Sequence, residues 1–227
     1  MHRSIKNYED IIRLIKSKLE GKTIIKFPKI IAVSKTFGLD NILPLVEYGH
    51  LDFGENKVQE MVFKHEELSK EIRWHMIGHL QRNKVKYIAP FVHLIHGADS
   101  KKLLETINKE GKKNNRIINC LLQFHIAKES TKFGFSIEEL REIISLKTYL
   151  DWDYINIKGV MGMATFTDNK LQVKEEFSLL RSFFNELKPV FGDDFKTLSM
   201  GMSGDYLEAI NEGSNMIRIG SDIFGTR

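Results

Sequence analysis

Short runs of apolar residues alternate along the chain with longer segments whose apolar residues recur every three or four positions. The short runs predict buried strands, and the longer segments predict amphipathic helices between them. The predicted strands are Ile30–Val33, Leu51–Phe53, Arg73–Ile77, Val92–Ile95, Ile117–Phe124, Ile157–Met161, Thr197–Met200 and Met216–Ile219. The predicted helices are Tyr8–Leu19, Asp40–Tyr48, Lys57–Leu68, Gln81–Ala89, Lys101–Lys113, Ile137–Thr148, Lys174–Leu187 and Tyr206–Glu212.

The order of these elements favours an α/β fold, a single-domain (β/α)8 TIM barrel over residues 1–227. Eight strands, seven helices between them and one leading helix give the element count of that barrel, and 227 residues lie near the lower end of its usual length. We expect the leading helix to take the place of the missing final one. An open, doubly wound sheet is the alternative, but no Gly-x-Gly-x-x-Gly turn follows the first strand.

Charge and composition exclude several classes of protein. The 34 basic residues exceed the 30 acidic ones only slightly and are spread along the chain without an aromatic-rich basic motif, so nucleic-acid binding is not expected. The apolar runs are far shorter than a membrane span. The start of the chain lacks the apolar stretch of a signal peptide, and the single cysteine, Cys120, cannot form an intrachain disulfide. We expect a cytoplasmic protein.

Two neighbouring strand ends predict an anion site. In such a barrel the active site lies at the C-terminal ends of the strands, and phosphate groups commonly bind after strands seven and eight. After the seventh strand, "MSGD" places Ser203 as a helix N-cap, with the backbone amides of Gly204 and Asp205 at the helix start. Taken alone, this segment is more simply a capped helix.

The eighth strand, in "MIRIGSDIFG", strengthens that prediction. Strand alternation puts Ile217 and Ile219 on one face and Arg218 and Gly220 on the other. A buried guanidinium needs an anionic or strongly accepting partner, which is either a ligand or a structural carboxylate. Gly220 and Ser221 add backbone amides and a hydroxyl beside the seventh-strand site. The two segments together favour a phosphate site.

Lys35 follows the first strand directly, in "KIIAVSKT". A lysine there is often a rim residue whose stem packs on the barrel. Beside a phosphate site it has a second use, because a neutral lysine amine forms a Schiff base with an aldehyde. The cofactor that carries an aldehyde and a phosphate on one ring is pyridoxal 5′-phosphate (PLP). A rigid strand end would hold the amine at a fixed distance from the phosphate.

Other polar residues at strand ends carry weaker signals. His75 and His79 lie four residues apart, but "HMIGH" is typical of a strand entering a glycine turn and lacks the glutamate of the zinc motif His-Glu-x-x-His. We therefore expect no metal site. His75 either lines the barrel mouth or is a packed histidine. Asn56 follows the second strand and either reaches a ligand or holds a turn.

Seven motifs in order resemble the pyridoxal phosphate homeostasis family (YggS/PROSC), which is related to the N-terminal barrel of alanine racemases. They are "AVSKT", "FGENKVQE", "WHMIGHLQRNK", "KFG", "GVMGM", "LSMGMSGD" and "IRIGSDIFGTR". The resemblance covers nearly the whole chain. Family members often have threonine where Ser221 stands and asparagine where His125 stands, which affects only local contacts.

The resemblance implies a role for each candidate residue. Lys35 would hold PLP as a Schiff base, and Asn56 and the Met161 region would line the ring pocket. The phosphate would be held by a larger set, namely Ser203, Gly204, Gly220 and Ser221. Arg218 would either face the pyridine nitrogen, as in the related racemases, or support the phosphate.

The resemblance also implies a carrier rather than an enzyme. A racemase needs two positioned proton-transfer groups, and in alanine racemases the group opposite the lysine is a tyrosine from a second domain. The sequence runs only to Arg227, straight after the last strand, so we expect that domain to be missing. A PLP-dependent racemase or lyase of low activity is the main alternative, and a barrel enzyme acting on a sugar phosphate is the third. We expect a monomer that holds PLP for intracellular homeostasis and delivers it to PLP-dependent apoenzymes.

Overall fold

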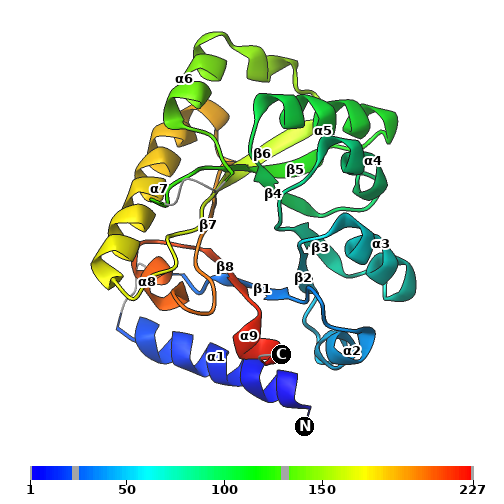
Figure 1. The fold of residues 1–227 in the computed structure, drawn as a ribbon, viewed down its shortest axis with the longest axis vertical. Coiled ribbons are helices and arrows are strands. Elements are labelled where there is room, and N and C mark those ends of the chain that lie inside the picture. Colours follow the sequence, from blue (N-terminus) through cyan, green and yellow to red (C-terminus); the bar gives the residue numbers. More distant parts are fainter. Residues whose placement is uncertain (1, 22–25, 129–132, 226–227) are drawn as a thin grey trace.

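The computed structural model describes residues 2–21, 26–128 and 133–225, and its centre is a closed parallel barrel. The strands pair in chain order and β8 closes on β1, so the predicted (β/α)8 barrel is confirmed and the open sheet is excluded. Figure 1 shows the helices around this barrel. The strands are β1 (Lys29–Val33), β2 (Asp52–Glu55), β3 (Arg73–Met76), β4 (Leu94–Ala98), β5 (Ile118–Gln123), β6 (Ile155–Met161), β7 (Thr197–Ser199) and β8 (Met216–Ile219).

The helices are α1 (Arg3–Leu19), α2 (Leu39–Glu47), α3 (Val58–Glu67), α4 (Val85–Ile88), α5 (Lys101–Lys113), α6 (Ile137–Ser145), α7 (Lys170–Phe191), α8 (Tyr206–Asn211) and α9 (Ser221–Phe224). Helices α2 to α8 occupy the connections between strands, α1 precedes β1 and α9 follows β8. The leading helix α1 packs against α2 and against the short α9, with the Asn7 side-chain amide donating to the carbonyl of Ile223 at 3.0 Å. It therefore lies beside the end of the barrel where a final helix would stand (Figure 1).

Helices α1, α4 and α7 differ most from their predicted bounds, and α1 begins at Arg3, five residues before the predicted Tyr8. The segment predicted as the helix Gln81–Ala89 forms a 3₁₀ turn over Arg82–Lys84 and only one α-helical turn, α4, because its first half has no buried apolar side chain. Helix α7 begins four residues before the predicted Lys174, since the side chain of Asn169 accepts a hydrogen bond from the amide of Gln172 and caps the helix there.

Strand alternation divides the core into two parts. Outward-facing residues of the strands, including Ile217 and Ile219, pack under the helices. A smaller apolar cluster fills the barrel itself and consists of Ile31, Leu94, Leu121, Met161 and Met216. Arg218 lies on the inward face as predicted, with 3% of its surface exposed.

Gly159 marks a bulge between β5 and β6, where the register shifts by one residue. Its φ is +150°, and a Cβ added there would lie 1.8 Å from the carbonyl oxygen of Thr197. We expect Gly159→Ala to lower the free energy of unfolding by about 2–4 kcal/mol, as measured by urea denaturation. Gly192→Ala is the matched control, because Gly192 has a φ of +77° but no atom within 4 Å of the added Cβ. Equal losses in both variants would contradict the steric explanation.

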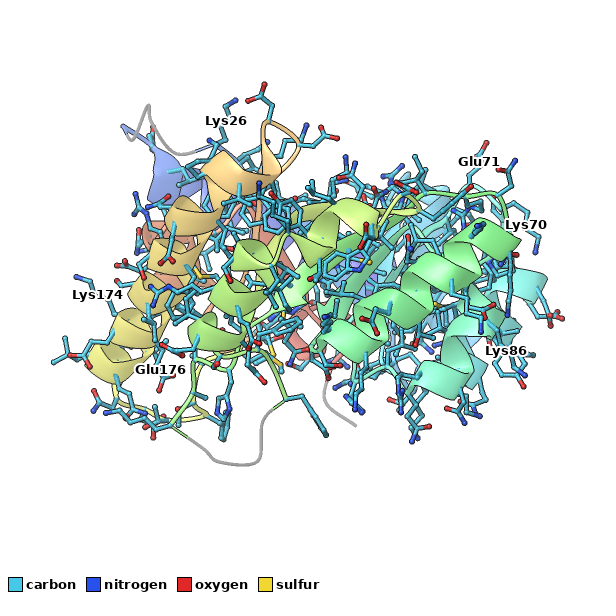
Figure 2. The ribbon with its side chains drawn as sticks, turned by 90° about the horizontal axis from the view of Figure 1, so that it is seen from above. Lys26, Lys70, Glu71, Lys86, Lys174 and Glu176 are labelled. Carbon is cyan, nitrogen blue, oxygen red and sulfur yellow. The ribbon has the colours of Figure 1, made fainter. Side chains whose placement is uncertain are left out.

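Basic side chains project from separate parts of the molecule. Figure 2 shows Lys70, Lys86 and Lys174 pointing outward from separate parts of the helical layer, as expected from their spread along the sequence. None of the described helices combines the length and the low charge that a membrane span requires.

Candidate functional site

A cavity of about 920 Å³ lies at the C-terminal ends of the strands. Of the residues predicted for the site, those that line it are Lys35, Asn56, Ser203, Gly204, Arg218, Gly220 and Ser221. They come from the ends of β1, β2, β7 and β8, so the fold brings together residues that are up to 186 positions apart in the sequence. His75 and Met161 are fully buried and do not line the cavity.

The residues on both sides of Lys35 are tied down by a buried ionic cluster. Ser34 is fully buried and donates to Glu55 at 2.6 Å, while its carbonyl accepts a hydrogen bond from Lys64 at 2.8 Å. On the other side, the amide of Thr36 donates to Glu60. Lys35 itself is exposed and projects from between these two anchors. The chain therefore presents an accessible amine on a fixed backbone.

Lys64 holds that cluster together. Its ammonium donates to Glu55 at 2.7 Å and to Glu60 at 2.8 Å, and only 2% of the residue is exposed. Burial raises the pKa of Glu55, and the charge and hydrogen bonds of Lys64 oppose that rise. Neither glutamate nor Lys64 was singled out from the sequence. The burial of Lys64 could have been predicted, because Lys64 follows Val58 and Met61 at helical spacing on the buried face of α3.

The loop after β7 differs in detail from its prediction. Helix α8 begins at Tyr206 with Asp205, not Ser203, at the N-cap position. A tight turn precedes it, in which the amide of Asp205 donates to the carbonyl of Met202 at 3.0 Å and the Asp205 carboxylate accepts from the amide of Met202 at 2.6 Å. The prediction of Ser203 as N-cap is therefore wrong. Ser203 instead lines the cavity, beside Gly204, whose added Cβ would meet no atom within 4 Å.

Arg218 is a buried cation that lines the cavity. Its guanidinium donates to the hydroxyl of Ser199 at 2.7 Å and to the carbonyl of Gly162 at 3.1 Å. Within the described residues it forms no ion pair, so the alternative of a structural Arg–carboxylate bridge is not what the structure shows. Burial lowers the pKa of Arg218 to about 10. A buried guanidinium without a carboxylate partner suits an anionic or strongly accepting ligand.

Two predicted site residues lie beneath the cavity. Of the two interpretations of His75, the structure agrees with the packed histidine, because its ring is hydrogen-bonded to Asp52 and His96. Met161 belongs to the apolar cluster inside the barrel, and Met163, two residues further along, lines the cavity in its place. The remaining histidine of the "HMIGH" motif, His79, is directed elsewhere and bonds Asp99 at 2.9 Å.

The sequence did not point to a cluster of possible metal ligands near the other end of the barrel. Side-chain donor atoms of Asp52, His75 and His93 lie within 4.8 Å of one another. However, Asp52 already accepts two hydrogen bonds from Arg73, at 2.9 and 2.6 Å, and pairs with Lys29 at 3.4 Å. The positive charges of Arg73 and Lys29, both beside the only carboxylate of this cluster, oppose the binding of a metal cation. We therefore assign no metal to this cluster.

The loop between β6 and α7 contributes a further wall that sequence patterns did not indicate. Residues 163–168 line the cavity. Thr165 is fastened to the buried Glu176, which accepts from its amide at 2.6 Å and from its hydroxyl at 2.7 Å. This loop is therefore held over the barrel end by a carboxylate from α7.

Comparison with known proteins identifies the family. Residues 8–227 match the alanine racemase N-terminal domain family. The chain is 36% identical over 200 residues to the pyridoxal phosphate homeostasis protein of Aquifex aeolicus. This alignment covers 88% of this chain and 87% of that protein. The chain belongs to the pyridoxal phosphate homeostasis protein family. The pyridoxal phosphate homeostasis protein of Schizosaccharomyces pombe is 32% identical over 222 residues, covering 96% of this chain and 91% of that one.

Solved structures agree with this family membership. PipY of Synechococcus elongatus, solved without PLP, is 29% identical with a TM-score of 0.82, covering 93% of this chain and all of that one. PipY with PLP bound is 30% identical with a TM-score of 0.80. An alanine racemase of Bartonella henselae shares the fold, with 14% identity and a TM-score of 0.67. The superposition covers 99% of this chain and 60% of the racemase chain. The family predicted from the seven motifs is confirmed, although Lys132, Thr226 and Arg227 of those motifs lie outside the described residues.

Proposed function

We propose that this protein binds PLP in the cavity at the C-terminal end of the barrel and holds it covalently at Lys35. The observation that carries the proposal is that one cavity presents an exposed lysine amine together with the polar loops after β7 and β8. PLP supplies an aldehyde that reacts reversibly with an amine, on a ring that also bears a phosphate. Relatives named for PLP homeostasis, and PipY solved with PLP, support this choice of ligand.

The residues present fit such a ligand. We assign the phosphate to the hydroxyls of Ser203 and Ser221 and to the backbone at Gly204 and Gly220. Within the described part of the chain, the amides of Ser203 and Gly204 donate no hydrogen bond to protein groups. These donors are therefore available to phosphate oxygens, and bonds of this kind are stronger than those between neutral groups.

The remaining residues surround the ring. Asn56, directly after β2, is placed to contact it, and Met163, two residues after β6, offers an apolar surface. Arg218 provides a charged donor at the base of the cavity. His75 and Met161 belong to this proposal only as side chains packed beneath the ligand.

We propose further that the protein is a carrier and not an enzyme, and that it acts in the cytoplasm as a monomer that delivers PLP to PLP-dependent apoenzymes. Two-sided proton transfer requires a second base opposite Lys35. Among the described residues that line the cavity there is no tyrosine, histidine or cysteine. Three acidic residues line it: Asp205 is bound within its own turn, Glu208 pairs with Lys170 at 3.0 Å, and Asp168 is an exposed residue of the loop before α7.

Solvent exchange distinguishes the carrier from a racemase or lyase. PLP-loaded protein is incubated with a panel of amino acids in deuterated water, and the α-hydrogen is followed by NMR. We expect no exchange above that of free PLP. Exchange that depends on the protein and is lost in Lys35→Ala would instead establish a PLP enzyme.

The phosphate assignment predicts a selective loss of affinity. We expect Ser203→Ala with Ser221→Ala to weaken PLP binding by roughly 10-fold or more per hydroxyl, because hydrogen bonds to a charged group contribute about 1.5–3 kcal/mol each. Binding of pyridoxal, which lacks the phosphate, should not change. Ser182→Ala, on the exposed face of α7, is the control. Equal losses for PLP and pyridoxal would contradict the assignment.

A further inference from the structure

Polar side chains cross the interior of the barrel in one unbroken row. The carboxylate of Asp52 accepts from Nε2 of His75 at 3.1 Å, and Nδ1 of His75 lies 3.0 Å from Nε2 of His96. Nδ1 of His96 lies 3.1 Å from the hydroxyl of Ser199, which accepts from Arg218 at 2.7 Å. All five residues are buried. The row begins at Asp52, the first residue of β2, and ends at Arg218 in the cavity.

The two ends of this row fix the direction of every hydrogen bond in it. A guanidinium can only donate, and an ionised carboxylate can only accept. Arg73 and Lys29 keep Asp52 ionised, and the pKa of Asp52 lies well below its usual range because of the hydrogen bonds from Arg73 and His75, which outweigh the effect of burial. Each neutral imidazole has one donor nitrogen and one acceptor nitrogen, so a ring that accepts a hydrogen bond at one nitrogen must donate one at the other. All hydrogen bonds in the row therefore run in the same direction, from Arg218 toward Asp52.

That constraint assigns both tautomers. His75 and His96 each carry their proton on Nε2, and the hydroxyl hydrogen of Ser199 points to Nδ1 of His96. Burial lowers the pKa of both histidines, which keeps them neutral. Reversing the row would move a proton from Arg218, whose pKa is about 10, to Asp52, so the reversed state is strongly disfavoured.

We propose that Asp52, His75, His96 and Ser199 are positioning residues, which hold the Arg218 guanidinium in one orientation and in its charged form toward the ligand. None of the four lines the cavity. Two of them, Asp52 and His75, stand near the end of the barrel that ordinarily serves stability alone. The proposal rests on the proposed function only for the identity of the ligand, because the row itself is a property of the protein.

The first test reads the tautomers in protein without ligand. Long-range ¹H–¹⁵N correlation NMR on the full-length, ¹⁵N-labelled chain distinguishes the two neutral forms from each other and from imidazolium. We expect neutral, Nε2-protonated rings for His75 and His96 at neutral pH. A proton on Nδ1 of either ring would overturn the proposal, and this readout stands even if PLP is not the ligand.

The second test removes one link. Ser199→Ala takes away one of the two acceptors of Arg218 and the hydroxyl that donates to His96. We expect PLP to bind about 10-fold to 100-fold more weakly, together with a change in the His96 tautomer signal. Ser214→Ala is the matched control, because Ser214 is also a buried serine, and among the described residues its hydroxyl bonds only the carbonyls of Leu198, Met200 and Met216. If both variants bind PLP equally well, or if the Ser199 variant leaves His96 unchanged, the row does not position Arg218.

Discussion

Replacing Lys35 by alanine is expected to abolish the visible absorbance that PLP acquires on binding this protein and to leave no adduct after borohydride reduction. Lys35 is exposed in the cavity, and the residues on either side of it are anchored by Glu55, Glu60 and Lys64. Lys29, the lysine of β1 itself, cannot take its place, because it lies at the opposite end of the strand and pairs with Asp52 at 3.4 Å. The measurement is an absorption spectrum and an intact mass after incubation with PLP and reduction.

A second lysine in the cavity provides the control. Lys170 also lines the cavity but pairs with Glu208 at 3.0 Å, and 84% of its side chain is exposed. We expect Lys170→Ala to retain both the absorbance and one reduced adduct. An adduct that survives in Lys35→Ala and disappears in Lys170→Ala would place the covalent bond at the start of α7 and contradict our account.

Lys64→Met is expected to lower the free energy of unfolding by about 3–5 kcal/mol at neutral pH, since removing one partner of a buried ion pair leaves the other charge unpaired. Glu55 would then keep only Ser34 as a donor, and the carbonyl of Ser34 would lose its own donor. Urea denaturation measures the loss. Lys109→Met, on the exposed face of α5, removes the same charge without a buried partner and should change stability by less than about 0.5 kcal/mol.

The loss should depend on pH in a defined direction. Burial raises the pKa of Glu55 above the value of 4.5 for an exposed carboxyl, so the folded state binds this proton more tightly and ionisation of Glu55 opposes folding as the pH rises. Lys64 offsets that cost in the native protein. The loss of unfolding free energy in Lys64→Met should therefore be small near pH 4.5 and grow toward neutral pH. Adding Glu55→Gln to the Lys64→Met chain should restore part of this free energy. A deficit independent of pH would show that packing, not charge, is what Lys64 contributes.

The strands, the barrel and most of the cavity were predictable because each rests on a local pattern. Buried parallel strands are continuous apolar runs, and the barrel places every strand end at one face. Once that is accepted, Lys35, Asn56, Ser203 and Ser221 must lie near one another. The inward placement of Arg218 followed from alternation along β8 alone.

What was missed depends on contacts between elements. Nothing in the local sequence shows that Lys64 meets Glu55, because one lies on α3 and the other on β2. The row from Asp52 to Ser199 likewise draws its members from four strands, and only the register of the closed barrel brings them together. The N-cap at Ser203 was wrong because a turn closed by Asp205 delays the helix. For His75 the sequence left open the barrel mouth or a packed position, and the Met161 region was implied by the family resemblance alone, since a strand pattern gives the face of a residue but not its depth in the barrel.

Peptide mapping of the reduced, PLP-loaded native protein tests the central claim most directly. Borohydride fixes PLP to the lysine that holds it, and digestion with mass spectrometry identifies that lysine. We expect a single pyridoxyl group, on Lys35. A pyridoxyl group on any other lysine, or no modification at saturating PLP, would contradict the account and leave the cavity to a ligand of another kind.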